Sequence, residues 1–558
     1  MKKLLASILV LAMVLSTMTA CSGNSGGESS GSSASGTSEV ETSQTEETRD
    51  INGLTLPICD ETEEISVLLV YDSPIVEDMN DIAGVKAMEE ATNVHVNWTT
   101  YTQTEMLEKF QQFLATGEYF DIMFPAGTNT YPGGYEQGIE EGVLVDMAEY
   151  IEKYMPNYMA LLNSNEDAKK QATYDDGKIH AVRVITGDKD GVGPSNAMMG
   201  PTYRADLLEK MGEDVPETIE ELHDLLVKCK ENGMSAPMTL ESDGGTTLSW
   251  AWGVNTDWSS NYWQYDKETS TVMLAPFAEG WDGWLDTMRN WDAEGLIDKN
   301  FTAGSPVISG DYSNFENDQT LFYGFWFSWL MGDELYKQGF VSNENLDLQP
   351  LAGFVLSEGD ELIKCSSDSC VGQEMFVTTQ ALDRIEVVSK WLDYNYTEEG
   401  VDFRYYGIEG ESYTVDENGN YTFTDNILHD PDGLSISDAL APYASRVFFG
   451  FQSFTADTAV QEATAGDGAI MQTKSGEVWS SAETTIAIPA GVKLSQEENE
   501  YVNTYMTDIN TLMAERMVKY ILGTDTTSHD EFRETLKAHN VEEVTKCYQD
   551  ACDRYNAR

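Results

Sequence analysis

The sequence predicts an α/β fold, on three observations. Strand-like and helix-like stretches alternate along residues 65–124, which is typical of a mostly parallel sheet with helices on its faces. Hydrophobic residues make up 41% of the 558-residue chain and include 12 tryptophans, so large cores can form. At about 150 residues per domain, the length indicates two or three units. Ligands of such sheets bind beyond the carboxyl ends of the strands.

The elements follow in order from residue 65. Residues 65–70 are rich in Val, Ile and Leu and predict a strand, 81–91 a helix, and 94–98 a second strand. Thr102 and Glu105 form a capping-box pattern that starts a helix ending at Gly117, and a third strand follows over 120–124.

A second α/β unit begins near residue 200. Thr218 and Glu221 form another capping box at the start of a helix, and aromatic stretches follow over 250–265 and 322–329. Residues 374–378 predict a strand and 381–396 a helix. The end of the chain is helical, with predicted helices from Ser495 to Gly523, over 530–537 and over 541–556.

The first 21 residues predict a secretory signal. Lys2 and Lys3 precede about fifteen mostly apolar residues, a run too short for the roughly 18–20 residues that span a membrane. A small residue followed by Cys21 resembles a bacterial lipobox, although Met18 stands where Leu is usual. We expect 1–21 to be a lipoprotein signal peptide and Cys21 to be lipidated. An ordinary signal peptide with an incidental cysteine is the alternative.

Residues 22–54 predict a disordered linker, because Ser, Gly, Thr and Glu dominate their start and such a stretch cannot bury enough apolar surface to offset its ordering entropy. The linker would tether the remaining chain to a membrane surface.

The chain is strongly acidic, with 96 Asp and Glu against 33 Lys and Arg and a net charge of −63. This balance excludes nucleic acid and anionic lipid headgroups as partners, because both require basic patches. Six cysteines remain after Cys21, with no metal-binding spacing, so we expect no metal and no cofactor. A disulfide between Cys365 and Cys370 stays open from the sequence alone.

Short motifs in collinear order identify a resemblance over residues 60–556. They lie at 108–123, 142–150, 176–182, 203–212, 215–222, 406–420 and 548–555. Their order resembles the bacterial extracellular solute-binding proteins (family 1) of ABC importers, and the last two resemble the large lipoprotein branch from Gram-positive bacteria. That resemblance implies a two-lobed, periplasmic-binding-protein-like α/β fold with hinge strands, a helical C-terminal region, and a ligand enclosed between lobes that close by a hinge motion.

The resemblance also implies domain boundaries and a ligand class. We expect lobe 1 over 55–190 with a return over 369–430, lobe 2 over 191–368, and a mixed segment with C-terminal helices over 431–558. Ligands of this branch are typically sugars, often oligosaccharides. Many relatives carry a calcium-like loop after the capped helix of the second lobe, but residues 230–237 here supply too few oxygen ligands, so we expect no calcium.

Sugar recognition requires aromatic faces for the C–H side of the ring and planar polar groups for its hydroxyls. The step Gly324-Phe325-Trp326 resembles the Gly-Pro-Trp step at which sugar-binding relatives stack a ring. Trp326 is therefore the first candidate, with core packing as the alternative for every tryptophan and turn formation for the polar residues. The other candidates are Trp329, Trp250, Trp252, Trp258, Asn129, Tyr131, Glu411, Arg446 and Trp479.

We therefore expect a monomeric, lipid-anchored receptor on the extracellular face of the cell membrane that passes a sugar to an ABC permease. A peptide or other polar solute is the first alternative, and a sensing role is another. A glycoside hydrolase, which needs a pair of carboxylates, is disfavoured. In a chain with 96 acidic residues, finding such a pair in the sequence is no evidence for a hydrolase. No H-E-x-x-H or P-loop motif occurs, and the six histidines are scattered.

Overall fold

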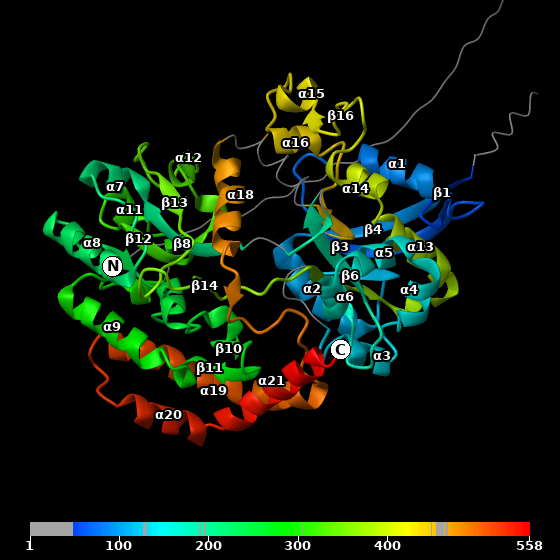
Figure 1. The fold of residues 1–558 in the computed structure, drawn as a ribbon. Coiled ribbons are helices and arrows are strands. Elements are labelled where there is room, and N and C mark those ends of the chain that lie inside the picture. Colours follow the sequence, from blue (N-terminus) through cyan, green and yellow to red (C-terminus); the bar gives the residue numbers. More distant parts are fainter. Residues whose placement is uncertain are drawn as a thin grey trace, which may run out of the picture. The chain divides into compact units, whose positions relative to one another are not determined.

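The computed structural model describes residues 48–125, 131–188, 191–194, 197–304, 306–447, 449–453, 463 and 467–558 (Figure 1). These residues belong to one compact unit, Thr48–Arg558. The predicted signal peptide, Cys21 and the predicted linker up to residue 47 lie outside the described residues. Among the described helices, none is both long enough and apolar enough to cross a membrane.

The larger sheet has seven strands, six of them in the order β18-β6-β15-β5-β3-β4, with β7 paired to β6. The central strand β3 is parallel to β4 and β5, whereas β15 is antiparallel to β5 and β6. The strands are β3 (Glu63–Val70), β4 (Val94–Tyr101), β5 (Ile122–Phe124), β6 (Val182–Asp188), β7 (Gly191–Val192), β15 (Val371–Val377) and β18 (Phe451–Ser453). The predicted βαβαβ alternation is confirmed.

The smaller sheet has the order β13-β8-β12-β9, comprising Leu348–Pro350, Met199–Arg204, Phe322–Phe327 and Met238–Thr239. β12 is antiparallel to β8 and parallel to β9. Its register against β8 shifts between Tyr323 and Trp326, which marks a bulge or local irregularity.

Four two-stranded pairs complete the strands: β1 (Arg49–Ile51) with β2 (Leu54–Leu56), β10 (Trp263–Asp266) with β11 (Thr271–Leu274), β14 (Ile363–Lys364) with β19 (Thr484–Thr485), and β16 (Tyr413–Val415) with β17 (Tyr421–Phe423). The first pair corrects the predicted linker. Residues 49–54 are part of this hairpin, because Leu54 and Leu56 give it an apolar side that packs with Met88 and Tyr394.

Helices begin where the sequence placed their caps. The capping boxes of Thr102 with Glu105, Thr218 with Glu221 and Ser495 with Glu498 all form. The α-helices before β12 are α1 (Ala83–Thr92), α2 (Gln103–Thr116), α3 (Tyr135–Glu140), α4 (Ala148–Tyr154), α5 (Pro156–Ser164), α6 (Glu166–Ala172), α7 (Ala205–Met211), α8 (Ile219–Glu231), α9 (Trp281–Glu294), α10 (Pro306–Ser309) and α11 (Ser313–Glu316).

Those after β12 are α12 (Glu334–Lys337), α13 (Ile385–Tyr394), α14 (Glu398–Tyr405), α15 (Asp425–Leu428), α16 (Ile436–Leu440), α18 (Asp467–Ser480), α19 (Gln496–Ile521), α20 (His529–Ala538) and α21 (Val541–Asn556). The 3₁₀ helices are η1 (Met79–Asp81), η2 (Thr247–Trp252), η3 (Trp258–Ser260), η4 (Ala275–Phe277), η5 (Phe301–Ala303), η6 (Ser328–Leu330) and η7 (Thr379–Arg384). The predicted helix over 381–396 therefore begins as η7.

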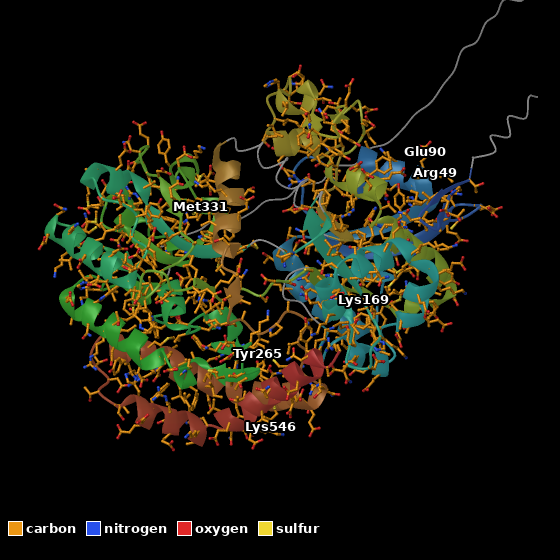
Figure 2. The ribbon with its side chains drawn as sticks, viewed as in Figure 1. Arg49, Glu90, Lys169, Tyr265, Met331 and Lys546 are labelled. Atoms are coloured by element: carbon orange, nitrogen blue, oxygen red, sulfur yellow. The ribbon has the colours of Figure 1, made fainter. Side chains whose placement is uncertain are left out.

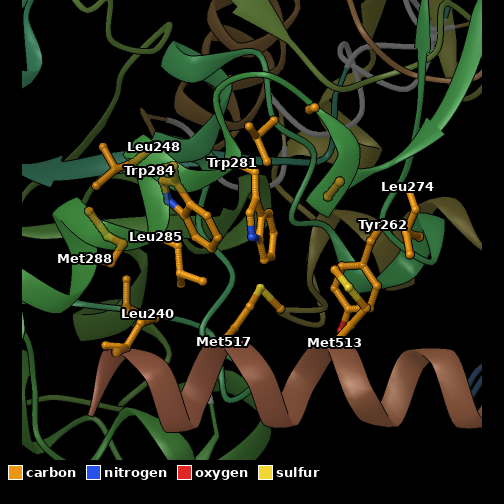
Figure 3. Close-up of a cluster of buried hydrophobic side chains, with 14 of the residues drawn as sticks. Leu240, Leu248, Tyr262, Leu274, Trp281, Trp284, Leu285, Met288, Met513 and Met517 are labelled. Carbon is orange, nitrogen blue, oxygen red and sulfur yellow. The ribbon is translucent and has the colours of Figure 1, made fainter. Parts of the chain in front are cut away.

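The C-terminal helices complete the core of the half that carries the smaller sheet. In Figure 3, Met517 projects from α19 toward Trp281, which lies beside Trp284 on α9, and Met513 projects toward Tyr262. The two indole rings lie 5.2 Å apart, centroid to centroid. α21 packs on the β10–β11 hairpin, where Tyr548 lies 4.8 Å from Trp263. Among the side chains labelled in Figure 2, Tyr265 is buried, whereas Lys169 and Lys546 are exposed.

The chain passes between the two sheets three times. It leaves the larger sheet after β7, returns between β13 and β15, and leaves again after β18. The second and third passages pair side by side, because β14 is parallel to β19. This ribbon provides the hinge strands that the sequence resemblance predicted.

Candidate ligand-binding site

A cavity of about 340 Å³ lies at the carboxyl ends of β3 and β5. Tyr71, Asp72 and Ser73 directly follow β3, and Phe124 ends β5. β3 and β5 are parallel, so their carboxyl ends meet at one edge of the sheet, where α/β folds bind ligands.

Arg446 is the only cation among the described residues that line this cavity, where it is accompanied by Asp72 and Asp438. Its φ of 51° places the backbone in the left-handed region, and its N–H donates to the carbonyl of Arg404 at 2.8 Å. Arg446, a predicted ligand residue, lines this strand-end cavity. Its role in ligand binding stays a prediction.

A second cavity, of about 510 Å³, lies beside the smaller sheet. β12 and β9 are parallel, so their carboxyl ends share an edge, and the antiparallel β8 begins at that edge. Phe325 of β12 and Met199 of β8 line the cavity, together with Trp250 of η2. Cys365 and Ile488, from the two passages that contain β14 and β19, line it as well.

Trp250 is held in this wall by close backbone packing. Its ring meets Phe325 edge-on, with centroids 6.1 Å apart. Thr247 at the start of η2 donates to the carbonyl of Gly324 at 2.7 Å. A Cβ at Gly324 would lie 2.3 Å from the hydroxyl of Thr246, so only glycine allows this approach.

Asp257 is the only charged residue among the described residues that line the second cavity. Its two carboxylate oxygens accept hydrogen bonds from the backbone N–H and the hydroxyl of Ser259, each at 2.8 Å, and so cap η3. A carboxylate oxygen can accept about two bonds, so Asp257 retains acceptor capacity. The next residue, Trp258, is 57% exposed.

Two further carboxylates, the buried Glu241 and the half-buried Asp243, lie near the carboxyl end of β9. Burial raises the pKa of Glu241 to about 7, although the hydroxyl of Tyr323 donates to it at 2.7 Å. Burial also raises the pKa of Asp243, which accepts from the hydroxyl of Tyr262 at 2.7 Å. These groups hold a proton more tightly than exposed carboxylates do.

A third cavity, of about 1010 Å³, includes Tyr131, Arg183, Glu374 and Lys493 in its lining. Burial raises the pKa of Glu374, but Lys493 and Arg183 outweigh it and lower that pKa to about 2. The ammonium of Lys493 lies 2.8 Å from the carboxylate, and the hydroxyl of Tyr174 donates to the same oxygen at 2.7 Å. The wall of this cavity thus contains an ion pair between Lys493 and Glu374.

The prediction that Trp326 contacts the ligand is corrected, because this residue lies in the core. The bulge in β12 turns Tyr323 and Trp326 to the same cluster and leaves Phe325 facing the second cavity. Trp326 is 0% exposed, and its indole N–H donates to the carbonyl of Leu330 at 3.0 Å. Phe325 stands where the Gly-Pro-Trp step has proline. It therefore lines the cavity in the way that was expected of Trp326.

Trp479 and Trp252 are also packed inside. The indole N–H of Trp479 donates to the carbonyl of Pro201 at 2.9 Å, and its ring lies on Gly200. Trp252 is half-buried against Gly280 and Gly283 of the α9 region. Neither tryptophan is among the described residues that line the two strand-end cavities.

The remaining candidates are spread over the molecule. Trp329 is 38% exposed and its ring lies 4.4 Å from that of Phe327, outside the described lining of the cavities. Tyr131 donates to Glu141 at 2.5 Å beside the third cavity. Glu411 is exposed, and its carbonyl accepts from Thr424. Asn129 lies outside the described residues.

Sequence reasoning missed Asp257, Phe325 and the segment 365–367. The alternation of side chains along β12 would have pointed to Phe325 if the bulge had been foreseen. Cys365 and Cys370, left open as a disulfide, are free thiols. Among the described residues, no group of three or more His, Cys, Asp or Glu could hold a metal ion.

A substitution at Gly200 tests the packing of Trp479. A Cβ at this position would lie 2.3 Å from Cγ of the buried indole, which its hydrogen bond to Pro201 holds in place. Gly200→Ala should therefore reduce the free energy of unfolding by about 1–3 kcal/mol, measured by urea denaturation. Gly193→Ala is the control, because nothing lies within 4 Å of its Cβ. Equal stability of the two variants would contradict this packing.

Comparisons with known proteins identify the class. The family model described as bacterial extracellular solute-binding protein matches residues 83–323. The fructooligosaccharide ABC transporter substrate-binding protein FusA of Streptococcus pneumoniae is 24% identical over 364 residues. That match covers 62% of this chain and 63% of the curated relative, so the chain matches less than two thirds of that relative's length.

Solved structures show the same fold. The HMO-binding solute-binding protein of Bifidobacterium longum infantis has a TM-score of 0.69 at 17% identity, covering 89% of this chain and 99% of that one. S. pneumoniae FusA in complex with kestose has a TM-score of 0.60 at 18% identity, covering 89% and 100%.

Residues 83–323 therefore resemble the bacterial extracellular solute-binding proteins, and the two-lobed α/β fold that the motifs predicted is confirmed. Solute-binding proteins are binding proteins rather than enzymes, and the matching family is extracellular.

Proposed function

We propose that this protein is a lipid-anchored extracellular receptor that captures a sugar, specifically an oligosaccharide, between its two lobes and delivers it to an ABC permease. It would act by binding alone, without catalysis. The observation that carries the proposal is the second cavity, where Trp250 and Phe325 stand beside Asp257 and several serines at the carboxyl ends of strands.

That combination is the chemistry of sugar recognition. Aromatic faces pack against the C–H side of a pyranose, and carboxylates and hydroxyls bind its rim. The exposed Trp258 adds a further aromatic surface next to Asp257. The names of two relatives support this ligand class, since one is a fructooligosaccharide-binding protein and the other is described as HMO-binding.

A thermal-shift panel of mono- and oligosaccharides tests the ligand class. A true ligand at 100 times its dissociation constant adds about 2.7 kcal/mol of stability and raises the melting temperature. We expect at least one neutral oligosaccharide to do so. A shift with peptides and none with carbohydrates would replace the sugar with a peptide, and hydrolysis of glycosides by the pure protein would replace the receptor with an enzyme.

The lipid anchor rests on Cys21 and is tested separately. In the native bacterium, Cys21→Ala should move the protein from the membrane fraction into the medium, as followed by immunoblot of both fractions. Cys59→Ala is the matched control and should stay with the membrane. Retention of Cys21→Ala in the membrane would exclude a lipid on this residue.

A further inference from the structure

Apolar side chains make up most of the wall of the second cavity. Ten of its fifteen described lining residues are Ala, Met, Trp, Phe, Cys, Ile or Tyr. An unsubstituted hexose carries a hydroxyl on nearly every carbon, and each hydroxyl that loses water without a new partner costs free energy. The wall therefore fits a ligand that presents an apolar group next to its polar ones.

The apolar residues come from parts of the chain that are far apart in the sequence. Met198 and Met199 precede or begin β8, Phe325 belongs to β12, and Ile488 follows β19. Met198 is 62% exposed although it is a large hydrophobic residue. Unbranched methionines adapt to irregular apolar shapes, so this part of the wall can fit closely around a small alkyl group.

The polar residues are limited to Asp257 and four serines. Asp257 accepts only, whereas a serine hydroxyl both donates and accepts. Ser260 is held in place at this cavity, where its hydroxyl donates to the carbonyl of Asp257 at 2.9 Å and accepts from Asn255 at 2.7 Å. Ser366 and Ser367 add hydroxyls from the segment that follows β14.

We propose that this cavity binds a 2-acetamido sugar, with the acetyl methyl group against the apolar wall, the amide N–H on Asp257 and the amide carbonyl on a serine hydroxyl. The acetamido group is the small sugar substituent that combines a methyl group, one donor and one acceptor. The cavity volume of about 510 Å³ lies within the usual range of ligand sites, about 300–1,000 Å³. The inference rests on the proposed function and narrows its ligand class.

Charge is consistent with this assignment. Asp257 has no cation beside it among the described lining residues, in a chain of net charge −63. A sugar acid would be repelled here, whereas an acetamido sugar is neutral and offers an N–H that a carboxylate prefers as a partner.

Matched pairs of neutral sugars isolate the acetamido group. We would titrate the full protein, by isothermal calorimetry and by tryptophan fluorescence, with N-acetylglucosamine against glucose, N-acetylgalactosamine against galactose, and N,N′-diacetylchitobiose against cellobiose. The acetamido member of at least one pair should bind about tenfold more tightly, the combined effect of one buried methyl group and one charge-assisted hydrogen bond. Salicin, a phenolic glucoside, is titrated as well, to test whether the apolar wall prefers an aromatic substituent to an acetamido group.

Two variants place the effect in this cavity. Met198→Ser removes apolar surface at an exposed side chain and should reduce the acetamido preference at least threefold without lowering the melting temperature. Leu434→Ser is the control, since Leu434 is also an exposed hydrophobic residue but does not belong to the described lining of the cavity.

Equal affinity within every pair, no binding of any acetamido sugar, or tighter binding of salicin would overturn the inference. Binding of unsubstituted oligosaccharides in the wider panel would leave the receptor function intact in each of these cases. A panel without any bound carbohydrate would overturn both.

Discussion

Acidification from pH 8 to pH 5.5 should raise the melting temperature of this protein by about 5 °C. Burial raises the pKa of Glu241 to about 7, of Asp402 to about 7 and of Asp393 to about 6. Their unfolded values lie near 4, so between these limits the folded state binds more protons than the unfolded state. Stability therefore falls as the pH rises through this window.

The size of the effect follows from the shift. One pKa unit corresponds to 1.36 kcal/mol, so Glu241 alone removes about 2 kcal/mol of stability between pH 5.5 and pH 8. The lowered pKa of Glu374, about 2, acts in the opposite sense, but its contribution is lost only below pH 4.5, outside the window. Protonation also reduces the self-repulsion of a chain with net charge −63.

Glu241→Gln should remove about 2 kcal/mol of this pH dependence. The glutamine carbonyl can still accept the hydrogen bond that Tyr323 donates at 2.7 Å, while the buried charge is gone. We expect a higher melting temperature than wild type at pH 8 and a similar one at pH 5.5, measured by circular dichroism. The exposed Glu268→Gln is the control. Parallel pH profiles for wild type and Glu241→Gln would refute this assignment.

The sequence predicted elements well where the signal was local. The capping boxes of α2, α8 and α19 involve residues three positions apart, and all three form. The linker was predicted too long because residues 49–54 form their hairpin only by packing against α1 and α13, a contact that depends on residues far along the chain.

The site was harder to predict because each tryptophan is a suitable surface for a sugar and also a suitable core residue. Trp326, Trp479 and Trp250 are all nearly buried, yet only Trp250 is a lining residue of a strand-end cavity. The choice depends on strand register, which a bulge in β12 shifts by one side chain. Ser366 and Ile488 reach the cavity only through the pairing of β14 with β19, for which single-sequence patterns contain no signal.

Trp326→Ala should lower the free energy of unfolding strongly, because Trp326 contributes to the core and not to the lining of the ligand cavity. The indole is fully buried, with ring centroids 5.0 Å from Phe315 and 5.2 Å from Tyr323. Truncation of a buried tryptophan to alanine costs about 3–5 kcal/mol, and the carbonyl of Leu330 also loses its donor. We expect the free energy of unfolding, measured by urea denaturation, to fall by that amount.

Trp258→Ala provides the contrast, since its side chain is 57% exposed and stands beside Asp257. The free energy of unfolding of this variant should match that of wild type within about 0.5 kcal/mol, as for most surface substitutions, while its affinity for the best sugar of the panel falls. Trp326→Phe keeps most of the buried volume and should leave that affinity within twofold of wild type. A Trp326→Phe variant that keeps its stability but loses the sugar would return Trp326 to the site, because only direct contact would then separate binding from packing.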